Sequence, residues 1–343
     1  MIIKKGENRK VYMNNQTVIT SLKGKYRKIS LFDPSISSEN IGDHIIKDYC
    51  MSICKDIFGE SMFVSIPTRS KLARQNYAHI MSSDFSLVLG TNLLASNMRK
   101  RKQWNIGLRD AKSIRDVVLF GVGWWQYQGP PDLYTKLLLK RILSNNLLHS
   151  VRDSYTEKKL KSIGITNVVN TACPTMWGLS PEFCKTIPMT KSKNVVTTLT
   201  NYNKKLDSDK AFLNVLLKNY DRVYVWLQAI EDYEYANSIV SHSKIHFVAP
   251  TLSAYDKLLE NNDIEYVGTR LHGGIRALNH RKRSIILAVD NRATEISKDT
   301  NLMVLQRDED PQKLEQIINS EFETNIVLPQ ENIDKWKSQF LIG

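Results

Sequence analysis

The sequence is poor in cysteine: its 343 residues include only Cys50, Cys54, Cys173 and Cys184. Four scattered residues are too few for a disulfide scaffold. Cys50 and Cys54 share one face of an expected helix, but no nearby cysteine or histidine completes a zinc site. We therefore expect buried, reduced thiols, with a weak metal or redox role as the alternative.

Long hydrophobic runs and common cofactor motifs are also missing. The longest apolar stretch, residues 117–125, is far shorter than a membrane span, and residues 1–6 do not resemble a signal peptide. There is no Gly-x-Ser-x-Gly elbow and no phosphate-binding Gly-Lys-Ser/Thr loop, and residues 121–123 lack the rest of a dinucleotide fingerprint. We expect a cytoplasmic protein without a metal, nicotinamide or flavin.

Basic residues are abundant. The sequence has 48 lysines and arginines against 35 aspartates and glutamates, which gives a formal net charge of +13. A surplus of this size attracts nucleic acid, an anionic membrane face or a phosphorylated substrate. The tightest cluster, Arg99-Lys100-Arg101-Lys102, lies next to Trp104. It is interpreted either as a solvated loop or as a patch for phospholipid headgroups or a polyanionic acceptor.

Strand and helix patterns alternate along almost the whole chain, which is typical of parallel sheets with helices on both faces. The length exceeds that of one compact core, so we expect an α/β protein of two Rossmann-like domains facing each other across a cleft. The domains are predicted at 1–180 and 194–343, with 181–193 as the connection and the last helix packing back on the first domain. Strands are expected at 29–32, 62–66, 85–89, 117–120, 149–151, 195–199, 223–227, 246–249, 264–269 and 284–289. Helices are expected near 44–58, 134–144, 209–219, 232–240, 252–260, 274–279, 310–319 and 332–341.

The strongest candidate for a functional site follows the apolar strand 264–269. Arg270 and His272 come directly after it, and Gly273-Gly274 open the next helical pattern. Ligands bind where such strands end, and a helix start favours an anion. Arg270 adds a permanent cation and His272 a group that titrates near neutral pH, which indicates an anionic substrate and proton transfer. Alternatively, Arg270 pairs with an acid and His272 caps its helix.

Arg152 occupies a comparable place at the end of the expected strand 149–151. If the two domains face each other, Arg152 and Arg270 hold one anion from opposite sides. The alternative for Arg152 is a local ion pair with Asp153 or Glu157.

Two glycine-containing segments of the first domain are weaker candidates. In Asn40-Ile41-Gly42-Asp43, the glycine permits close backbone approach, and Asp43 either caps a helix or contacts the substrate. Gly90-Thr91-Asn92 follows a strand, as does Gly121-Val122-Gly123. Small residues at these places either leave room for a ligand or form tight turns.

In their order along residues 28–310, these segments resemble the polysaccharide pyruvyl transferase family. The resemblance rests on Asn40-x-Gly42-Asp43, Ser150-Val151-Arg152-Asp153, Arg270-Leu271-His272-Gly273 and Asp290-Asn291-Arg292. The sequence departs from the family at Gly90-Thr91-Asn92, where a run of glycines is common, at Cys173-Pro174, where Asp-Pro is common, and at Arg283-Ser284, where a proline is common. The first two departures concern the region expected to hold the acceptor.

The resemblance implies a fold similar to that of the B-type glycosyltransferases (GT-B). It implies transfer of the pyruvyl unit of phosphoenolpyruvate onto two hydroxyls of a sugar in a cell-surface polysaccharide, such as a capsule or exopolysaccharide, or in its precursor. The implied products are a cyclic pyruvate ketal and phosphate. We expect phosphoenolpyruvate as a co-substrate on the side of the second domain, and the resemblance implies that Arg152, Arg270 and His272 hold it or act on it.

The acceptor is expected on the first domain as a sugar, an oligosaccharide or a lipid-linked glycan. Further substrate contacts are expected from Asn40, Gly42, Asp43, Gly90, Thr91, Asn92, Leu271, Gly273, Gly274 and Arg292. The basic surplus fits peripheral contact with an anionic inner membrane face, and we expect no nucleic acid partner. The alternatives are a GT-B glycosyltransferase that uses a nucleotide-sugar and a binding protein for anionic glycans or nucleic acid.

Overall fold

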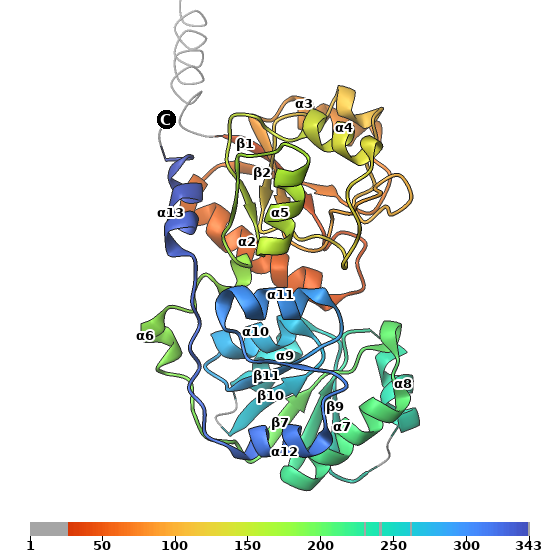
Figure 1. Ribbon diagram of the computed structural model, residues 1–343, viewed down its shortest axis with the longest axis vertical. Helices are drawn as coiled ribbons and strands as arrows, with labels where there is room; N and C mark the ends of the chain where they lie inside the picture. Colours follow the sequence, from red (N-terminus) through yellow and green to blue (C-terminus); the bar gives the residue numbers. More distant parts are fainter. Residues whose placement is uncertain (1–26, 230, 240–241, 261–262, 342–343) are drawn as a thin grey trace, which may run out of the picture.

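The computed structural model describes residues 27–229, 231–239, 242–260 and 263–341. Two α/β domains follow one another along the long axis of the molecule, each with a parallel sheet at its centre (Figure 1). In the ranges just given, no helix is long and apolar enough to cross a membrane. The expectation for residues 1–6 lies outside the described residues.

The first domain is built on a sheet with the strand order β2-β1-β3-β4. The pair β5-β6 continues this sheet, because the N–H of Gly121, just beyond β4, donates to the Ser150 carbonyl of β5 at 3.0 Å. The strands are Lys28–Asp33 (β1), Met62–Pro67 (β2), Phe85–Leu89 (β3), Val117–Phe120 (β4), His149–Val151 (β5) and Val168–Asn170 (β6). The helices are Ile41–Phe58 (α2), Arg74–Met81 (α3), Leu133–Ile142 (α4) and Ser154–Ser162 (α5).

The second domain has a six-stranded sheet in the order β12-β11-β10-β7-β8-β9. Its central strands β10 and β11 are buried along their whole length, as expected for a parallel sheet covered on both faces. The strands are Asn194–Thr197 (β7), Arg222–Trp226 (β8), Ile245–Val248 (β9), Ile264–Gly268 (β10), Ser284–Ala288 (β11) and Val304–Gln306 (β12). The helices are Leu206–Asn219 (α7), Glu231–Ile239 (α8), Leu252–Leu259 (α9), Leu271–Asn279 (α10), Asn291–Thr300 (α11) and Pro311–Asn319 (α12).

In each sheet the strand order reverses beside the first strand. Ligands of such sheets bind at this switch point, beyond the carboxyl ends of the strands. In the second domain β7 lies between β8 and β10, which is the Rossmann order. In the first domain β1 lies between β2 and β3, a flavodoxin-like variant of the same doubly wound architecture. The expected α/β fold is confirmed, and both switch points coincide with candidate segments: Gly90-Thr91-Asn92 follows β3, and Arg270 follows β10.

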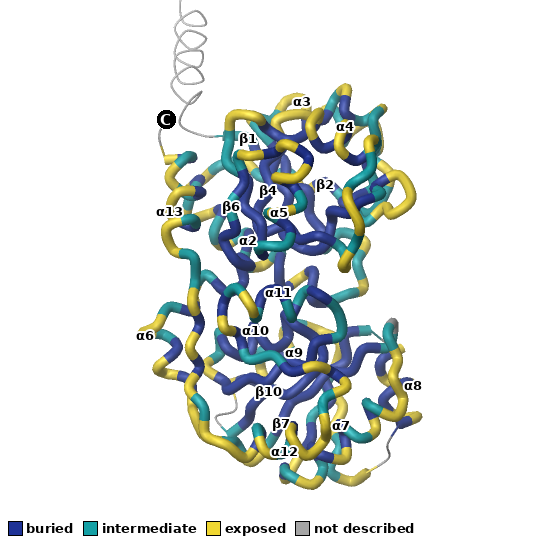
Figure 2. Tube along the Cα trace, viewed as in Figure 1, coloured by how far each residue is buried: buried dark blue, intermediate teal, exposed yellow. Residues whose placement is uncertain are grey.

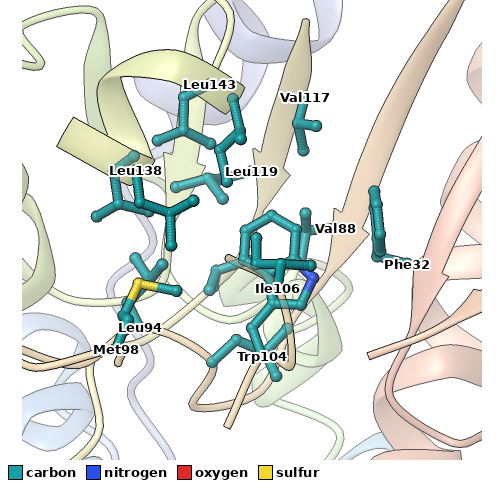
Figure 3. Packing of buried hydrophobic residues seen from close by; sticks show 14 of the residues in the cluster. Phe32, Val88, Leu94, Met98, Trp104, Ile106, Val117, Leu119, Leu138 and Leu143 are labelled. Atoms are coloured by element: carbon teal, nitrogen blue, oxygen red, sulfur yellow. The ribbon is translucent and has the colours of Figure 1, made fainter. Parts of the chain in front are cut away.

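Both sheets lie inside hydrophobic cores, with buried strands and exposed outer helix faces (Figure 2). In the first domain Trp104 has no solvent exposure and meets the ring of Phe32 edge-on at a centroid distance of 5.1 Å. Figure 3 shows this cluster, with Phe32, Val88, Leu94, Met98, Trp104, Ile106, Val117, Leu119, Leu138 and Leu143 labelled. Trp104 therefore belongs to the core, whereas the neighbouring basic residues 99–102 are exposed.

A shared apolar cluster joins the two domains. It contains Ile41 at the start of α2, Ile275 of α10 and Cys173 from the segment that follows β6. Across it, the guanidinium of Arg276 forms an ion pair with Asp48 of α2 at 3.0 Å. These contacts fix the strand ends of the first domain opposite those of the second.

The C-terminal helix α13 (Gln330–Ser338) packs against the first domain, where Trp336 stacks on Phe120 at a ring distance of 4.5 Å. The segment 181–193 contains a short helix, α6 (Pro181–Cys184), and a buried Ile187. The domain limits at 1–180, 181–193 and 194–343 remain a prediction. All four cysteines are buried and free, as expected.

Three local expectations were incomplete. Helix α10 begins at Leu271 rather than at Gly274, because Arg270 takes the extended conformation of an N-cap residue, with φ −102° and ψ 107°, and the helix follows it directly. The polar helices α3 and α11 were not expected. Since α10 starts three residues early, Leu271 and His272 lie in its first turn, whose N–H groups have no partner within the helix.

Candidate active site

The backbone around Arg270 is held by a network of hydroxyls at the end of β10. The Arg270 N–H lies 3.1 Å from both Thr198 Oγ1 and the Tyr266 hydroxyl, and the Tyr266 hydroxyl donates to the Arg270 carbonyl at 2.8 Å. A Cβ on Gly268 would lie 2.7 Å from Thr198 Oγ1 and 2.8 Å from the Tyr266 hydroxyl. Glycine is therefore required there for the network to close.

The side chain of Arg270 is engaged inside the second domain. Its Nη2 lies 3.2 Å from Asp232 Oδ2 of α8, and its Nε donates to the Leu199 carbonyl at 3.3 Å. Arg270 is 9% exposed and Asp232 is 2% exposed. The alternative interpretation, in which Arg270 pairs with an acid, therefore describes part of its role, although its side chain also lines the cleft described below.

His272 lies in the first turn of α10 and is 5% exposed. Its Nε2 is 3.7 Å from the Sγ of Cys173. Burial lowers the pKa of His272 well below its ordinary value, and the nearby cations Arg152 and Arg292 lower it further, while Asp290 opposes them. His272 is therefore neutral at neutral pH, and an anion bound beside it raises its pKa.

Arg152, at the end of β5, is 1% exposed. Its Nη2 donates to Asn92 Oδ1, and its Nε is 3.6 Å from Asp153 Oδ2. Its Nε and Nη1 have no hydrogen-bond partner among the described residues. A Cβ on Gly123 would lie 2.4 Å from Nε, so the glycine lets the guanidinium rest on the backbone. Such a buried, under-bonded cation is costly without a ligand, which indicates an anion site.

In the segment 40–43, Asn40 caps the helix and Asp43 contacts side chains of other segments. Asn40 caps α2, because its Oδ1 accepts from the Gly42 N–H at 3.2 Å. Asp43 does not cap the helix: its Oδ2 forms a 2.6 Å ion pair with Arg69, and its Oδ1 accepts from the Thr91 hydroxyl at 3.0 Å. Of the two alternatives left open for Asp43, helix capping is therefore excluded, and Asp43 instead orients Arg69 and Thr91.

Arg292 lies opposite this segment, in the first turn of α11. Its Nη2 lies 2.6 Å from Asp290 Oδ2, and Asp290 also caps α11 by accepting from the Arg292 N–H at 3.0 Å. Burial raises the pKa of Asp290, but the interactions with Arg292 and the charge of Arg152 outweigh this and hold that pKa below its ordinary value. Asp290 is therefore anionic.

These groups surround two adjoining hollows between the domains. The larger one, here called the cleft, has a volume of about 600 Å³, and the small hollow beside His272 has about 20 Å³, room for a single water. Of the expected site residues, the cleft is lined by Asn40, Thr91, Asn92, Arg270 and Arg292. The small hollow is lined by Asn40, Gly42, Arg270, Leu271, His272 and Arg292.

Other expected site residues do not line either hollow. Arg152 donates a hydrogen bond to Asn92, which lines the cleft. An anion in the cleft therefore reaches Arg152 only if Asn92 moves. Gly90 and Gly274 allow neighbouring side chains to pack closely against the backbone. A Cβ added to Gly90 would lie 2.4 Å from Ile46, and one added to Gly274 would lie 2.5 Å from Ile286. Asp43 and Gly273 also lie outside the hollows.

Several lining residues were missed from the sequence. Trp125 and Gln126 follow the glycine-containing end of β4, and Gln228 follows β8. Their position after strands was a usable signal. Arg69 and Asp232 carried none, because their roles depend on ion pairs with residues 26 and 38 positions away.

Two doubly wound domains with a site between their strand ends define a protein of GT-B architecture. The fold is similar to that of S. aureus MnaA, solved with UDP, at a TM-score of 0.53 and 12% identity over 91% of this chain and 90% of that one. Two weaker matches each have a TM-score of 0.45. One is the UDP-GlcNAc 2-epimerase of Neisseria meningitidis bound to UDP-GlcNAc, at 13% identity over 92% of this chain and 99% of that one. The second is UGT89C1 of Arabidopsis thaliana complexed with quercetin, at 9% identity over 92% of this chain and 94% of that one. At 12% identity, the match to MnaA establishes likeness of fold alone.

The chain belongs to the polysaccharide pyruvyl transferase family, whose sequence profile matches residues 13–291. The resemblance that the strand-end motifs predicted is thereby confirmed. The family makes the protein a transferase that acts on polysaccharide. A search of curated proteins finds no significant match.

Proposed function

We propose that the protein transfers the pyruvyl unit of phosphoenolpyruvate to two hydroxyls of one acceptor sugar, forming a pyruvate ketal and releasing phosphate. The observation that supports this most is Arg152, a buried cation with two nitrogens that lack hydrogen-bond partners among the described residues, beside neutral His272 at the start of α10. This arrangement suits a small, multiply charged anion that undergoes proton transfer. It requires no cofactor beyond phosphoenolpyruvate.

In the proposed reaction, the oxygen of the first sugar hydroxyl bonds to C2 of phosphoenolpyruvate as the C2=C3 π bond breaks and its electrons form a new C–H bond at the methylene carbon. Neutral His272 takes the hydroxyl proton and passes it to that carbon in the same step, so that the methylene becomes a methyl group. The second hydroxyl displaces phosphate from C2, and its proton leaves with the phosphate. Arg152, Arg270 and the N–H groups at the start of α10 stabilise the carboxylate and the departing phosphate.

A direct test is phosphate release from phosphoenolpyruvate with a panel of sugar acceptors. The rival reaction, glycosyl transfer from a nucleotide-sugar, is favoured by the fold similarity to a protein solved with UDP. Heat protection separates the two, since a ligand that binds the folded state raises Tm. We expect phosphoenolpyruvate to raise Tm and UDP-N-acetylglucosamine not to do so. Protection by the nucleotide-sugar alone would favour the rival.

Trp125 is proposed as the platform for the acceptor sugar. It lines the cleft, and the guanidinium of Arg101 lies 4.6 Å from its ring centroid. The ring face that Arg101 does not cover is the surface proposed for the C–H face of a sugar. We expect Trp125→Ala to raise the acceptor KM about tenfold while the phosphoenolpyruvate KM stays within about twofold, and Trp125→Phe to retain most affinity. An unchanged acceptor KM in steady-state assays of Trp125→Ala would remove Trp125 from the site.

We also propose a cytoplasmic protein, with peripheral contact to an anionic membrane face where a lipid-linked acceptor is used. This proposal rests on the basic surplus of +13 and on the exposed cluster 99–102. The acceptor side is assigned to the first domain, because Thr91, Asn92 and Trp125 bring that domain to the cleft.

A further inference from the structure

A second large hollow lies within the first domain, away from His272. Its volume is about 840 Å³, and its lining includes four cations: Lys71, Arg99, Lys102 and Arg109. We call it the basic hollow. Two of its cations, Arg99 and Lys102, come from the cluster that the sequence alone left open between a solvated loop and an anion-binding patch.

The four cations of the basic hollow are available to a ligand. None of them forms an ion pair or a side-chain hydrogen bond with any residue in the described ranges. The single carboxylate in the lining, Asp110, is already used: its Oδ1 accepts from the Tyr77 hydroxyl at 2.6 Å and its Oδ2 from the Gly107 N–H at 2.7 Å. The lining therefore has a net charge of about +3 with no internal partner for it.

The basic hollow adjoins the cleft through one pair of segments. Arg69 lines the cleft and Lys71 the basic hollow, while Gln103 lines the cleft and Lys102 the basic hollow. The two segments are joined where Asn105 Nδ2 donates to the Arg69 carbonyl at 3.1 Å. A ligand that extends from the cleft past these two segments therefore reaches the basic hollow.

We infer that the basic hollow binds a phosphate or diphosphate group joined to the acceptor glycan while the sugar to be modified lies in the cleft. This inference rests on the proposed function, because it assigns the cleft to the acceptor. Four cations in one lining match a compact group with several charges better than the single carboxylate of an acidic sugar. Arginine forks at 99 and 109 suit phosphate oxygens, and Tyr134 and Leu108 in the same lining suit an adjoining apolar portion.

The test uses the full-length protein and each sugar of the acceptor panel in two forms: a methyl glycoside and a farnesyl diphosphate glycoside. In Arg99→Ala/Lys102→Ala, the KM for the diphosphate form relative to that for the methyl form should rise about tenfold, about 1.4 kcal/mol. The control, Lys55→Ala/Lys335→Ala, removes two exposed lysines outside the basic hollow and loses the same charge. Its KM ratio should not change. Inorganic diphosphate should compete with the diphosphate glycoside and not with phosphoenolpyruvate.

Two outcomes overturn the inference: equal KM ratios in the two double variants, or competition of diphosphate with phosphoenolpyruvate alone. The first would assign the effect to overall charge, and the second to the site beside His272. If no acceptor releases phosphate, the proposed function fails, and calorimetry with inorganic diphosphate still tests the hollow. Binding should then weaken about tenfold in Arg99→Ala/Lys102→Ala and stay unchanged in the lysine control; equal binding in both would reject the site by itself.

Discussion

Replacement of His272 by alanine should slow phosphate release from phosphoenolpyruvate by about 10²–10⁴-fold, the range typical of a lost acid–base group. His272 lies at the start of α10, where it faces the hollow between the domains, and burial with two nearby arginines keeps it neutral. The loss should appear in kcat, because the proton transfer belongs to the transition state. The measurement is steady-state phosphate release with the best acceptor of the panel.

The control for this variant is His272→Gln, which keeps a polar side chain but cannot exchange a proton near neutral pH. It should lose turnover like the alanine variant, yet phosphoenolpyruvate should still raise its Tm, since the binding cations remain. Full turnover in either variant would contradict the assigned role. Lost turnover together with lost ligand protection would instead make His272 a residue that positions the site.

The charge state of His272 provides a second test of its proposed role. In an NMR titration of the free protein, its Cε1–H signal should keep the neutral chemical shift as the pH falls through 6.5, because its pKa is lowered well below that value. Bound phosphoenolpyruvate favours the imidazolium, so the midpoint should then move to higher pH. A free-protein midpoint at or above 6.5 would contradict the burial argument, and the absence of a ligand-induced rise would place the anion elsewhere.

The strand-end rule accounts for the candidate residues that the structure places at the hollows. Arg270, His272 and Thr91 line them because parallel strands end at one edge of a sheet and because the strand order of both sheets reverses where those segments lie. The pattern of apolar residues along the chain was sufficient to place β3, β4 and β5 at their observed bounds. Periodicity failed for the polar helices α3 and α11, whose stability depends on caps and tertiary contacts.

The pairing of charges was beyond the reach of sequence patterns. Arg270 meets Asp232 across 38 positions, and Arg69 meets Asp43 across 26, so each pair forms only after the sheet has assembled. The role of Gly123 was likewise beyond the reach of sequence patterns. Gly123 resembles part of a nucleotide-binding turn, but its physical role is to leave space for Arg152, which only the folded chain brings against it.

Arg152→Met should lower kcat/KM for phosphoenolpyruvate by at least about 10²–10³-fold, as for loss of a preorganised anion-stabilising group. Phosphoenolpyruvate should no longer raise Tm. In the absence of ligand, Tm should fall modestly, because the variant loses the hydrogen bond to Asn92 and leaves buried Asp153 without its cation at 3.6 Å, while it also removes a buried cation with two unpartnered nitrogens. A large fall in the ligand-free Tm with normal phosphoenolpyruvate affinity would make Arg152 a structural residue.

Gly123→Ala tests the same position while keeping the arginine. The added Cβ would lie 2.4 Å from Arg152 Nε and 2.5 Å from Cζ, closer than atoms can approach, so the guanidinium must move. The matched control is Gly129→Ala, whose Cβ meets nothing within 4 Å. We expect Gly123→Ala to raise the phosphoenolpyruvate KM at least tenfold and Gly129→Ala to leave it unchanged. Equal KM values in the two alanine variants would contradict the proposed role of Gly123, because the position of the Arg152 guanidinium that Gly123 allows would then not matter for phosphoenolpyruvate binding.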